Sequence, residues 1–247
     1  MKKLRFIIFP LAAALLFTNV QAAVCGYYIM RKKNHERPVT DPCFSFMSGH
    51  NACYIGPDEK VIYLTFDAGY ENGNVKRVAD TLKKHNAAGA FFVLDNTVKR
   101  NADLLVRLSD DGNLICNHTS RHKDCTKLSK EEFEAEITSL EGLYKEMTGR
   151  TMAKFFRPPE GRFDEKTLSY AEDMGYKTVL WSFAYADWAN DKQPSPEYAH
   201  KKIRDNLHPG AVLLLHPTSK TNADILDRLL CEWEKEGYRF GSLEELS

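Results

Sequence analysis

After Lys60 the chain alternates short apolar runs with longer segments of helical periodicity. Short continuous apolar runs are typical of buried strands, and apolar residues at three- and four-residue steps are typical of helices. Their alternation predicts a parallel sheet with crossover helices, in either a barrel or a doubly wound open sheet. The predicted strands are Val61–Phe66, Ala90–Leu94, Leu114–Cys116, Lys154–Phe156, Thr178–Phe183, Ala211–Leu215 and Tyr238–Phe240.

Residue types at the ends of the helical segments support this interpretation. Ser129 followed by Glu132 predicts a capping box, and Gly149 is placed to end the same helix. The same kinds of signal mark three more helices, at Asp164, at Ser195-Pro196 and before Gly237.

The N-terminal part of the chain differs from the rest. Residues 1–22 combine three basic residues, an apolar run and small residues, which predicts a signal peptide, with an uncleaved N-terminal anchor as the alternative. Residues 23–59 are rich in proline and glycine and are expected to form an irregular N-terminal extension. Residues 60–247 are predicted to form a single catalytic domain.

Charge and cysteine content exclude some partners and leave others open. Basic and acidic residues number 34 each, so the chain lacks the basic excess expected of a nucleic-acid-binding protein. Its six cysteines, in a chain predicted to be exported, permit up to three disulfides, and the pairing stays open. Their spacing is not typical of a cysteine-based zinc site.

Polar side chains lie just after the ends of five of the predicted strands. Because the carboxyl ends of parallel strands lie on one face of a sheet, these residues are expected to converge on one mouth. They are Asp67, His118, Arg157, Asp187 and His216.

Two histidines near the end of the third strand suggest a metal site. On a helical turn, the four-residue spacing of His118 and His122 would put both imidazoles on one face, within reach of one ion. His-x3-His also occurs by chance, so the strand-end position supports the prediction more than the spacing does. The other histidines are interpreted as structural: His35, His50, His85, His200 and His208.

Asp67, Arg157 and His216 are candidates for acid–base chemistry. A carboxylate beside a metal-bound water can take its proton, and the Arg157 guanidinium can hold Asp67 in place and keep it ionised. A protonated His216 can then donate to a leaving amine, a group that cannot depart as an anion.

These residues resemble the polysaccharide deacetylases, the NodB-homology group of carbohydrate esterase family 4, from about Lys60 to the C-terminus. The motifs that carry the resemblance, in the family's order, are Thr65–Gly69, His118–His122, Arg157–Gly161, Asp187-Trp188 and Leu214–His216.

The resemblance implies an α/β fold, a distorted (β/α) barrel of about seven parallel strands. It implies that Asp67 is the base, Arg157 its partner and His216 the acid. The metal would be a divalent ion, zinc first, with cobalt, manganese or magnesium as alternatives, and its ligands would be His118 and His122.

The same resemblance assigns substrate contacts. Trp188, Leu214 and Asp187 are expected to bind substrate, and the backbone N–H near Glu160 to hold the oxyanion.

Within the family, the string Thr65–Asn72, with Phe156–Pro159 and Ala184–Trp188, most resembles the muramic-acid de-N-acetylases of spore-forming bacteria. That branch implies hydrolysis of N-acetylmuramic acid in peptidoglycan glycan strands, as a step toward the muramic δ-lactam of spore cortex. The expected protein is an exported monomer in the cell wall, on the outer face of the cytoplasmic membrane or in the cortex space.

Three positions depart from the family pattern. Ala68 stands where the family has a metal-binding aspartate, which predicts weaker metal binding. Ala184 stands where many relatives have an aspartate that supports the acid histidine, and Glu160 replaces a common tyrosine.

Two alternatives remain beside muramic-acid deacetylation. One is deacetylation of N-acetylglucosamine in peptidoglycan or a chitin-like polymer. The other is a wall-binding pseudoenzyme, suggested by Ala68, although binding alone has no need of Asp67, Arg157 and His216.

Overall fold

The computed structural model describes residues 26–246. The predicted signal peptide and Cys25 lie outside these residues. Within residues 26–246, no helix is both long enough and apolar enough to cross a membrane.

An eight-stranded parallel sheet forms the centre of the molecule. Its order is β10-β4-β5-β6-β7-β8-β3, with β9 also paired to β4. An isolated parallel bridge joins Phe183, which follows β8, to Leu213 of β9 and nearly closes the ring. The expected distorted barrel is therefore confirmed, and the alternative of a doubly wound open sheet is not. All seven predicted strands are present, as β4 (Val61–Ala68), β5 (Gly89–Val93), β6 (Leu114–Asn117), β7 (Ala153–Phe156), β8 (Lys177–Val179), β9 (Ala211–Leu215) and β10 (Arg239–Phe240).

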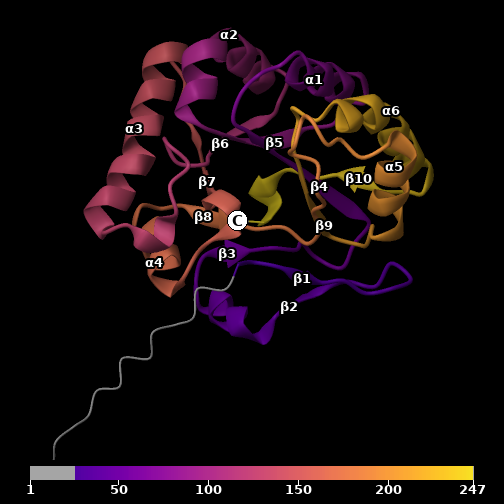
Figure 1. Cartoon of the computed structure of the whole chain (residues 1–247), viewed down its shortest axis with the longest axis horizontal. Helices are drawn as coiled ribbons and strands as arrows, with labels where there is room; N and C mark the ends of the chain where they lie inside the picture. The colour runs from indigo at the N-terminus through magenta and orange to yellow at the C-terminus, as the bar shows by residue number, and fades with distance from the viewer. Residues whose placement is uncertain (1–25, 247) are drawn as a thin grey trace, which may run out of the picture.

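Helices surround the strands on the outside. In Figure 1 they form an arc that runs from α4 through α3, α2, α1 and α6 to α5. The capping box between Ser129 and Glu132 is present in both directions, and Gly149 ends α3 with φ at 71°. The helices are α1 (Asn74–Lys84), α2 (Asp95–Asp110), α3 (Lys130–Thr148), α4 (Glu165–Asp173), α5 (Pro196–Asp205) and α6 (Lys220–Lys235).

The residues of β4 alternate between two cores because successive side chains of a strand point to opposite faces. Ile62, Leu64, Phe66 and Ala68 belong to the large cluster that packs under the helices. Tyr63 belongs to a second cluster, inside the barrel.

This alternation places Asp67 at the mouth of the barrel. Asp67 has the same parity as Tyr63 and therefore projects from the inner face of β4, whereas Ala68 packs on the helix side with 1% of its surface exposed. The strand register itself thus separates these two neighbouring residues.

The N-terminal extension is more ordered than predicted. It forms a hairpin of β1 (Ile29–Met30) and β2 (Val39–Thr40), a 3-10 helix η1 (Pro42–Gly49), and β3 (Ala52–Cys53), which pairs in parallel with β8. Sequence periodicity missed these strands because two residues are too few to show alternation.

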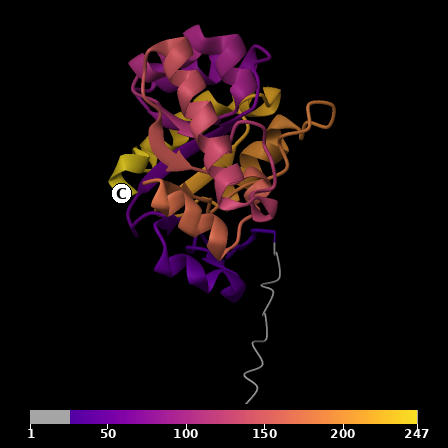
Figure 2. The same cartoon turned by 90° about the vertical axis from the view of Figure 1, so that its left-hand side faces the viewer.

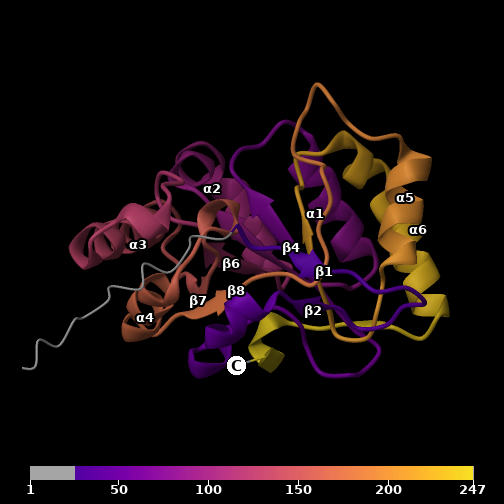
Figure 3. The same cartoon turned by 60° about the horizontal axis from the view of Figure 1, so that its bottom comes forward.

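The extension also covers part of the barrel. It lies along the side that the helices leave open, seen at the bottom of Figures 1 and 2 and at the front of Figure 3. Phe44 and Met47 pack there against Phe163, Leu168 and Leu180 of the main domain.

Four of the six cysteines, Cys53, Cys116, Cys125 and Cys231, are thiols, so no disulfide forms among these four.

Candidate active site

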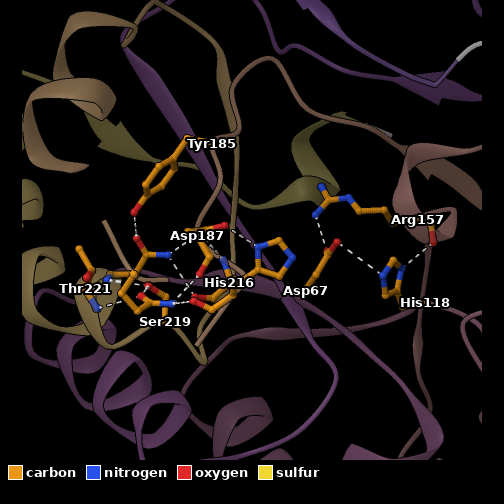
Figure 4. Close-up of polar contacts among 11 residues, drawn as sticks. Asp67, His118, Arg157, Tyr185, Asp187, His216, Ser219 and Thr221 are labelled. Carbon is orange, nitrogen blue, oxygen red and sulfur yellow. Dashed lines mark hydrogen bonds and ion pairs between the residues drawn. The ribbon is translucent and has the colours of Figure 1, made fainter. Parts of the chain in front are cut away.

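A buried ion pair forms the base of the site. Arg157, directly after β7, is fully buried, and its Nη1 donates to Oδ1 of Asp67 at 2.8 Å. Figure 4 shows the two side chains facing each other, so the structure brings together the residues that the sequence proposed as base and partner.

The guanidinium of Arg157 is held by three further acceptors. Nε donates to the carbonyl of Val179 at 2.9 Å, and Nη2 donates to Oγ1 of Thr65 at 2.8 Å and to the carbonyl of Leu180 at 3.1 Å. Sequence reasoning missed Thr65, although its position two residues before Asp67 puts it on the same face of β4. The result is a rigid donor aimed at one oxygen of Asp67.

The electrostatics favour an ionised Asp67. Burial opposes the charge, but His118, Arg157 and His216 together outweigh it and lower the pKa of Asp67 below its ordinary value of 3.8. Asp67 is therefore a carboxylate at neutral pH, which is the form that accepts a proton.

The loop after β6 presents His118 and His122. The predicted helical turn is wrong: Thr119 and His122 adopt left-handed conformations, with φ of 68° and 57°. The side chain of Asn117 accepts from the N–H of Thr119, and Oγ1 of Thr119 accepts from the N–H of His122, so local hydrogen bonds hold the loop. The two imidazoles nevertheless meet, with ring centroids 5.0 Å apart.

Strained backbone at this loop is consistent with a functional role. Left-handed conformations at non-glycine residues cost on the order of 1–3 kcal/mol each and persist where the surroundings enforce them. The strain falls on Thr119, between the two histidines, and on His122 itself, and both imidazoles line the cleft.

His118 fits the role of a neutral metal ligand. Its Nδ1 lies 2.8 Å from the carbonyl of Arg157, so this nitrogen carries the proton and Nε2 is left with its lone pair. Burial lowers the pKa of His118 to about 4, which keeps the ring neutral. Nε2 lies 3.5 Å from Oδ2 of Asp67.

The donor set at the cleft fits a divalent ion held by two imidazoles. The described residues place no third histidine, cysteine or acidic ligand in a common cluster with His118 and His122. Ala68 has no ligand atom at the position where the family has an aspartate, so solvent would complete the coordination.

His216 lies across the cleft from His118 and is positioned by Asp187. Its Nδ1 is 2.7 Å from Oδ1 of Asp187, and its backbone N–H donates to Oδ2 of the same residue at 2.8 Å. In Figure 4 the ring of His216 lies on one side of Asp67 and His118 on the other.

The interpretation of Asp187 as a substrate contact is corrected by its burial. Its side chain is fully enclosed and does not line the cleft. It supports His216 instead, so the support expected to be missing at Ala184 comes from Asp187, three residues later.

Asn222 and Tyr185 extend this network. Nδ2 of Asn222 donates to Oδ2 of Asp187 at 2.6 Å and to the carbonyl of His216 at 3.1 Å, and the hydroxyl of Tyr185 donates to Oδ1 of Asn222. Sequence reasoning missed Asn222 because it lies on α6 and forms no motif with the residues that it contacts.

The environment of His216 favours its charged form. Burial of the ring lowers its pKa, but the hydrogen bond to Asp187 and the charges of Asp187 and Asp67 outweigh burial and raise the pKa above the ordinary 6.5. The imidazolium is thus retained at higher pH than usual, as a general acid requires.

Asp187→Asn is expected to move the alkaline limb of the kcat/KM profile to lower pH. Because the pKa of His216 is raised, the acid form is fully present below that pKa and is lost as pH rises through it. Removing the Asp187 charge lowers the pKa and moves this loss toward acid. The measurement is a pH–rate profile of wild type and variant, and an unmoved alkaline limb would contradict the role of Asp187.

A cleft of about 650 Å³ joins these groups. Three of the five strand-end residues line it, Asp67, His118 and His216, together with His122. The other two, Arg157 and Asp187, are buried and contact Asp67 and His216 instead. Its volume lies within the range of about 300–1,000 Å³ that is typical of small-molecule sites.

The remaining predicted contacts lie on the walls of the cleft. Trp188, 61% exposed, and Leu214, nearly buried, both line it. Glu160 also lines it, with φ at 56°, and its carboxylate pairs with Arg162.

Comparison with known proteins agrees with this geometry. Residues 55–179 match the polysaccharide deacetylase family. The chain is 40% identical over 219 residues to the peptidoglycan-N-acetylmuramic acid deacetylase PdaA of Bacillus subtilis, covering 87% of this chain and 83% of that protein. The solved structure of PdaA, described as a family 4 carbohydrate esterase, superposes with a TM-score of 0.87 at 37% identity, covering 92% and 98% of the two chains. A peptidoglycan-N-acetylglucosamine deacetylase of Bacillus cereus is 29% identical over 224 residues, covering 89% and 80%.

Proposed function

Because the chain belongs to the polysaccharide deacetylase family, with the barrel of carbohydrate esterase family 4, we propose that it hydrolyses the N-acetyl group of N-acetylmuramic acid in peptidoglycan. The observation that carries the chemistry is that Asp67, whose pKa is lowered, and His216, whose pKa is raised, line the same cleft. The choice of sugar rests on the similarity to PdaA.

The side chains supply a complete proton path. As a water oxygen bonds to the acetyl carbonyl carbon, Asp67 takes the proton of that water, and Arg157 holds the carboxylate in line. As the C–N bond breaks, Nε2 of His216 gives its proton to the nitrogen. Acetic acid and a free sugar amine leave, and the acid ionises in solvent. Asp67 loses its extra proton to solvent and His216 regains one from solvent, which restores both groups.

His118 and His122 would hold the divalent ion, for which zinc is the first candidate. When bound, the ion polarises the acetyl carbonyl and makes the attacking water more acidic. The backbone N–H near Glu160 is proposed as a second stabiliser of the developing oxyanion.

The product suggests the biological role. Muramic acid carries a lactyl carboxyl beside the amine that deacetylation frees, so condensation of the two closes a six-membered lactam. We therefore place this activity before δ-lactam formation in spore cortex peptidoglycan, carried out by an exported monomer that acts on glycan strands in the cell wall or cortex space.

Deacetylation of N-acetylglucosamine is the second candidate. It is favoured by the relative from B. cereus, whose name gives that substrate. Both reactions need the same acid and base, so the sugar has to be distinguished by assay.

The deciding experiment is acetate release from peptidoglycan strands stripped of peptides, compared with chitin oligomers, with added zinc, cobalt, manganese or magnesium. We expect metal-stimulated release from the stripped strands, because they present muramic acid without its peptide. Activity on chitin oligomers alone would contradict the assignment of muramic acid as the substrate. No metal-stimulated release from either substrate would favour a wall-binding pseudoenzyme.

A further inference from the structure

A second group of metal-binding side chains lies between α1 and α6. His85 directly follows α1, and Asp227 and Cys231 lie on α6. The two helices pack side by side, as Figure 1 shows. Both run back from the carboxyl edge of the barrel, where the active site lies, so the end of α1 and the second half of α6 lie toward the opposite edge.

The distances within this group are close to those between ligands of a shared ion. Nε2 of His85 lies 2.8 Å from Oδ1 of Asp227 and 4.0 Å from Sγ of Cys231. One ligand atom from each residue lies within 4.8 Å of the others. With zinc bonds of about 2.0–2.3 Å, tetrahedral ligand atoms are about 3.2–3.7 Å apart, so small side-chain adjustments would suffice.

The helix geometry preorganises two of the ligands. Asp227 and Cys231 are four residues apart on α6 and therefore share one face, which is turned toward His85. The imidazole of His85 is itself held, with only 7% of its side chain exposed. A cation bound here would have two ligands fixed by one helix and the third fixed by its neighbour.

Glu234 supplies a further observation. Its Oε1 lies 3.2 Å from Nδ1 of His85, so both ring nitrogens of His85 face carboxylates. A neutral imidazole has only one N–H. If Nδ1 donates to Glu234, the lone pair of Nε2 faces the Asp227 oxygen and the Cys231 sulfur, which is the arrangement that a cation between them would satisfy.

We propose that His85, Asp227 and Cys231 form a second divalent-metal site, suited to zinc, with Glu234 as the positioning residue that orients His85. A thiolate, an imidazole and a carboxylate are together a typical zinc donor set, with water in the fourth position. The carboxylate behind the histidine fixes the tautomer that leaves Nε2 for the metal.

Lys84 is the competing cation at this site. Its Nζ lies 2.6 Å from Oδ1 of Asp227, but 63% of the side chain is exposed, so it can move into solvent when the ion binds. Bound metal would then join residues 85, 227 and 231 and stabilise the contact of α1 with α6.

Cobalt titration of the purified protein tests the site without relying on activity. The site contains a thiol and the His118–His122 site does not, so a near-ultraviolet cobalt–thiolate charge-transfer band would distinguish the two sites, and its loss in Cys231→Ser would assign it to this thiol. We expect the band in wild type, its loss in Cys231→Ser, and its retention in Asp224→Asn, a matched change on the same helix. Absence of the band in wild type, or its persistence in Cys231→Ser, would overturn the proposal.

Zinc affinity, measured by competition with a chelating dye, separates metal binding from a merely structural role. Glu234→Gln is expected to weaken zinc binding at this site about 10- to 100-fold, because it removes the charge that supports His85. Acetate release should be unchanged in Cys231→Ser and Glu234→Gln, since both positions lie outside the cleft. If neither variant alters zinc binding, His85 is simply an imidazolium held between two carboxylates, and the metal site is refuted.

Discussion

Asp67→Asn is expected to lower kcat/KM for acetate release by about 10²–10⁴-fold, the usual contribution of a positioned general base. Asparagine keeps an oxygen for the hydrogen bond from Arg157 but cannot take a proton from water. The loss should appear mainly in kcat, because substrate contacts on the cleft walls are unaltered. Steady-state kinetics on stripped glycan strands would measure it.

Asp95→Asn is the matched control for this variant. Asp95 begins α2 and pairs with Lys99 near the surface, so the same loss of one carboxylate should leave the kinetics unchanged. Near-wild-type turnover in Asp67→Asn would show that another group acts as the base.

Arg157→Met is expected to destabilise the protein by about 3–5 kcal/mol, the range found when one partner of a buried ion pair is removed. The substitution leaves the charge of Asp67 uncompensated by Arg157, and it leaves the carbonyls of Val179 and Leu180 without their donor. Denaturant unfolding of metal-free protein would measure the change.

Activity should fall in the same variant. Burial raises the pKa of Asp67, and without Arg157 fewer positive charges oppose this effect, so less of the carboxylate form is available to take a proton. Arg162→Met is the control: Arg162 is half exposed, and its pairs with Glu160 and Asp124 are surface contacts worth at most about 1 kcal/mol. Equal stability losses in the two variants would contradict the special role of Arg157.

Much of the fold follows from local patterns in the sequence. All seven main strands and the capped start of α3 were predicted because burial of a strand and capping of a helix depend on neighbouring residues. The exceptions are short. β3 pairs with β8 through only two residues, and the ring closes through one bridge at Phe183, so neither leaves a periodic signal.

The site was predictable as a set of residues but not as an arrangement. Strand-end positions alone predicted that Asp67, His118 and His216 share one cleft and that Arg157 contacts Asp67, since parallel strands end on one face. The role of Asp187 was misjudged, because whether an acidic side chain faces the cleft or a histidine depends on packing between distant segments.

The sequence did not show how the two histidines meet. Their spacing suggested a helical turn, but the N–H of Thr119 donates to the side chain of Asn117 and the N–H of His122 donates to Oγ1 of Thr119. These bonds accompany left-handed backbone at Thr119 and His122, a conformation that the sequence of a non-glycine loop does not signal.

The sequence by itself determined the alternation of strands and helices and the residue types that end the strands. These depend on apolar periodicity and on chain order, which are local properties. Only the tertiary structure decided the charge states of Asp67 and His216. It also decided the support of His216 by Asp187 and Asn222, and the approach of His85 to Cys231. Each depends on burial and on charges contributed by segments far apart in the chain, and no local pattern records those distances.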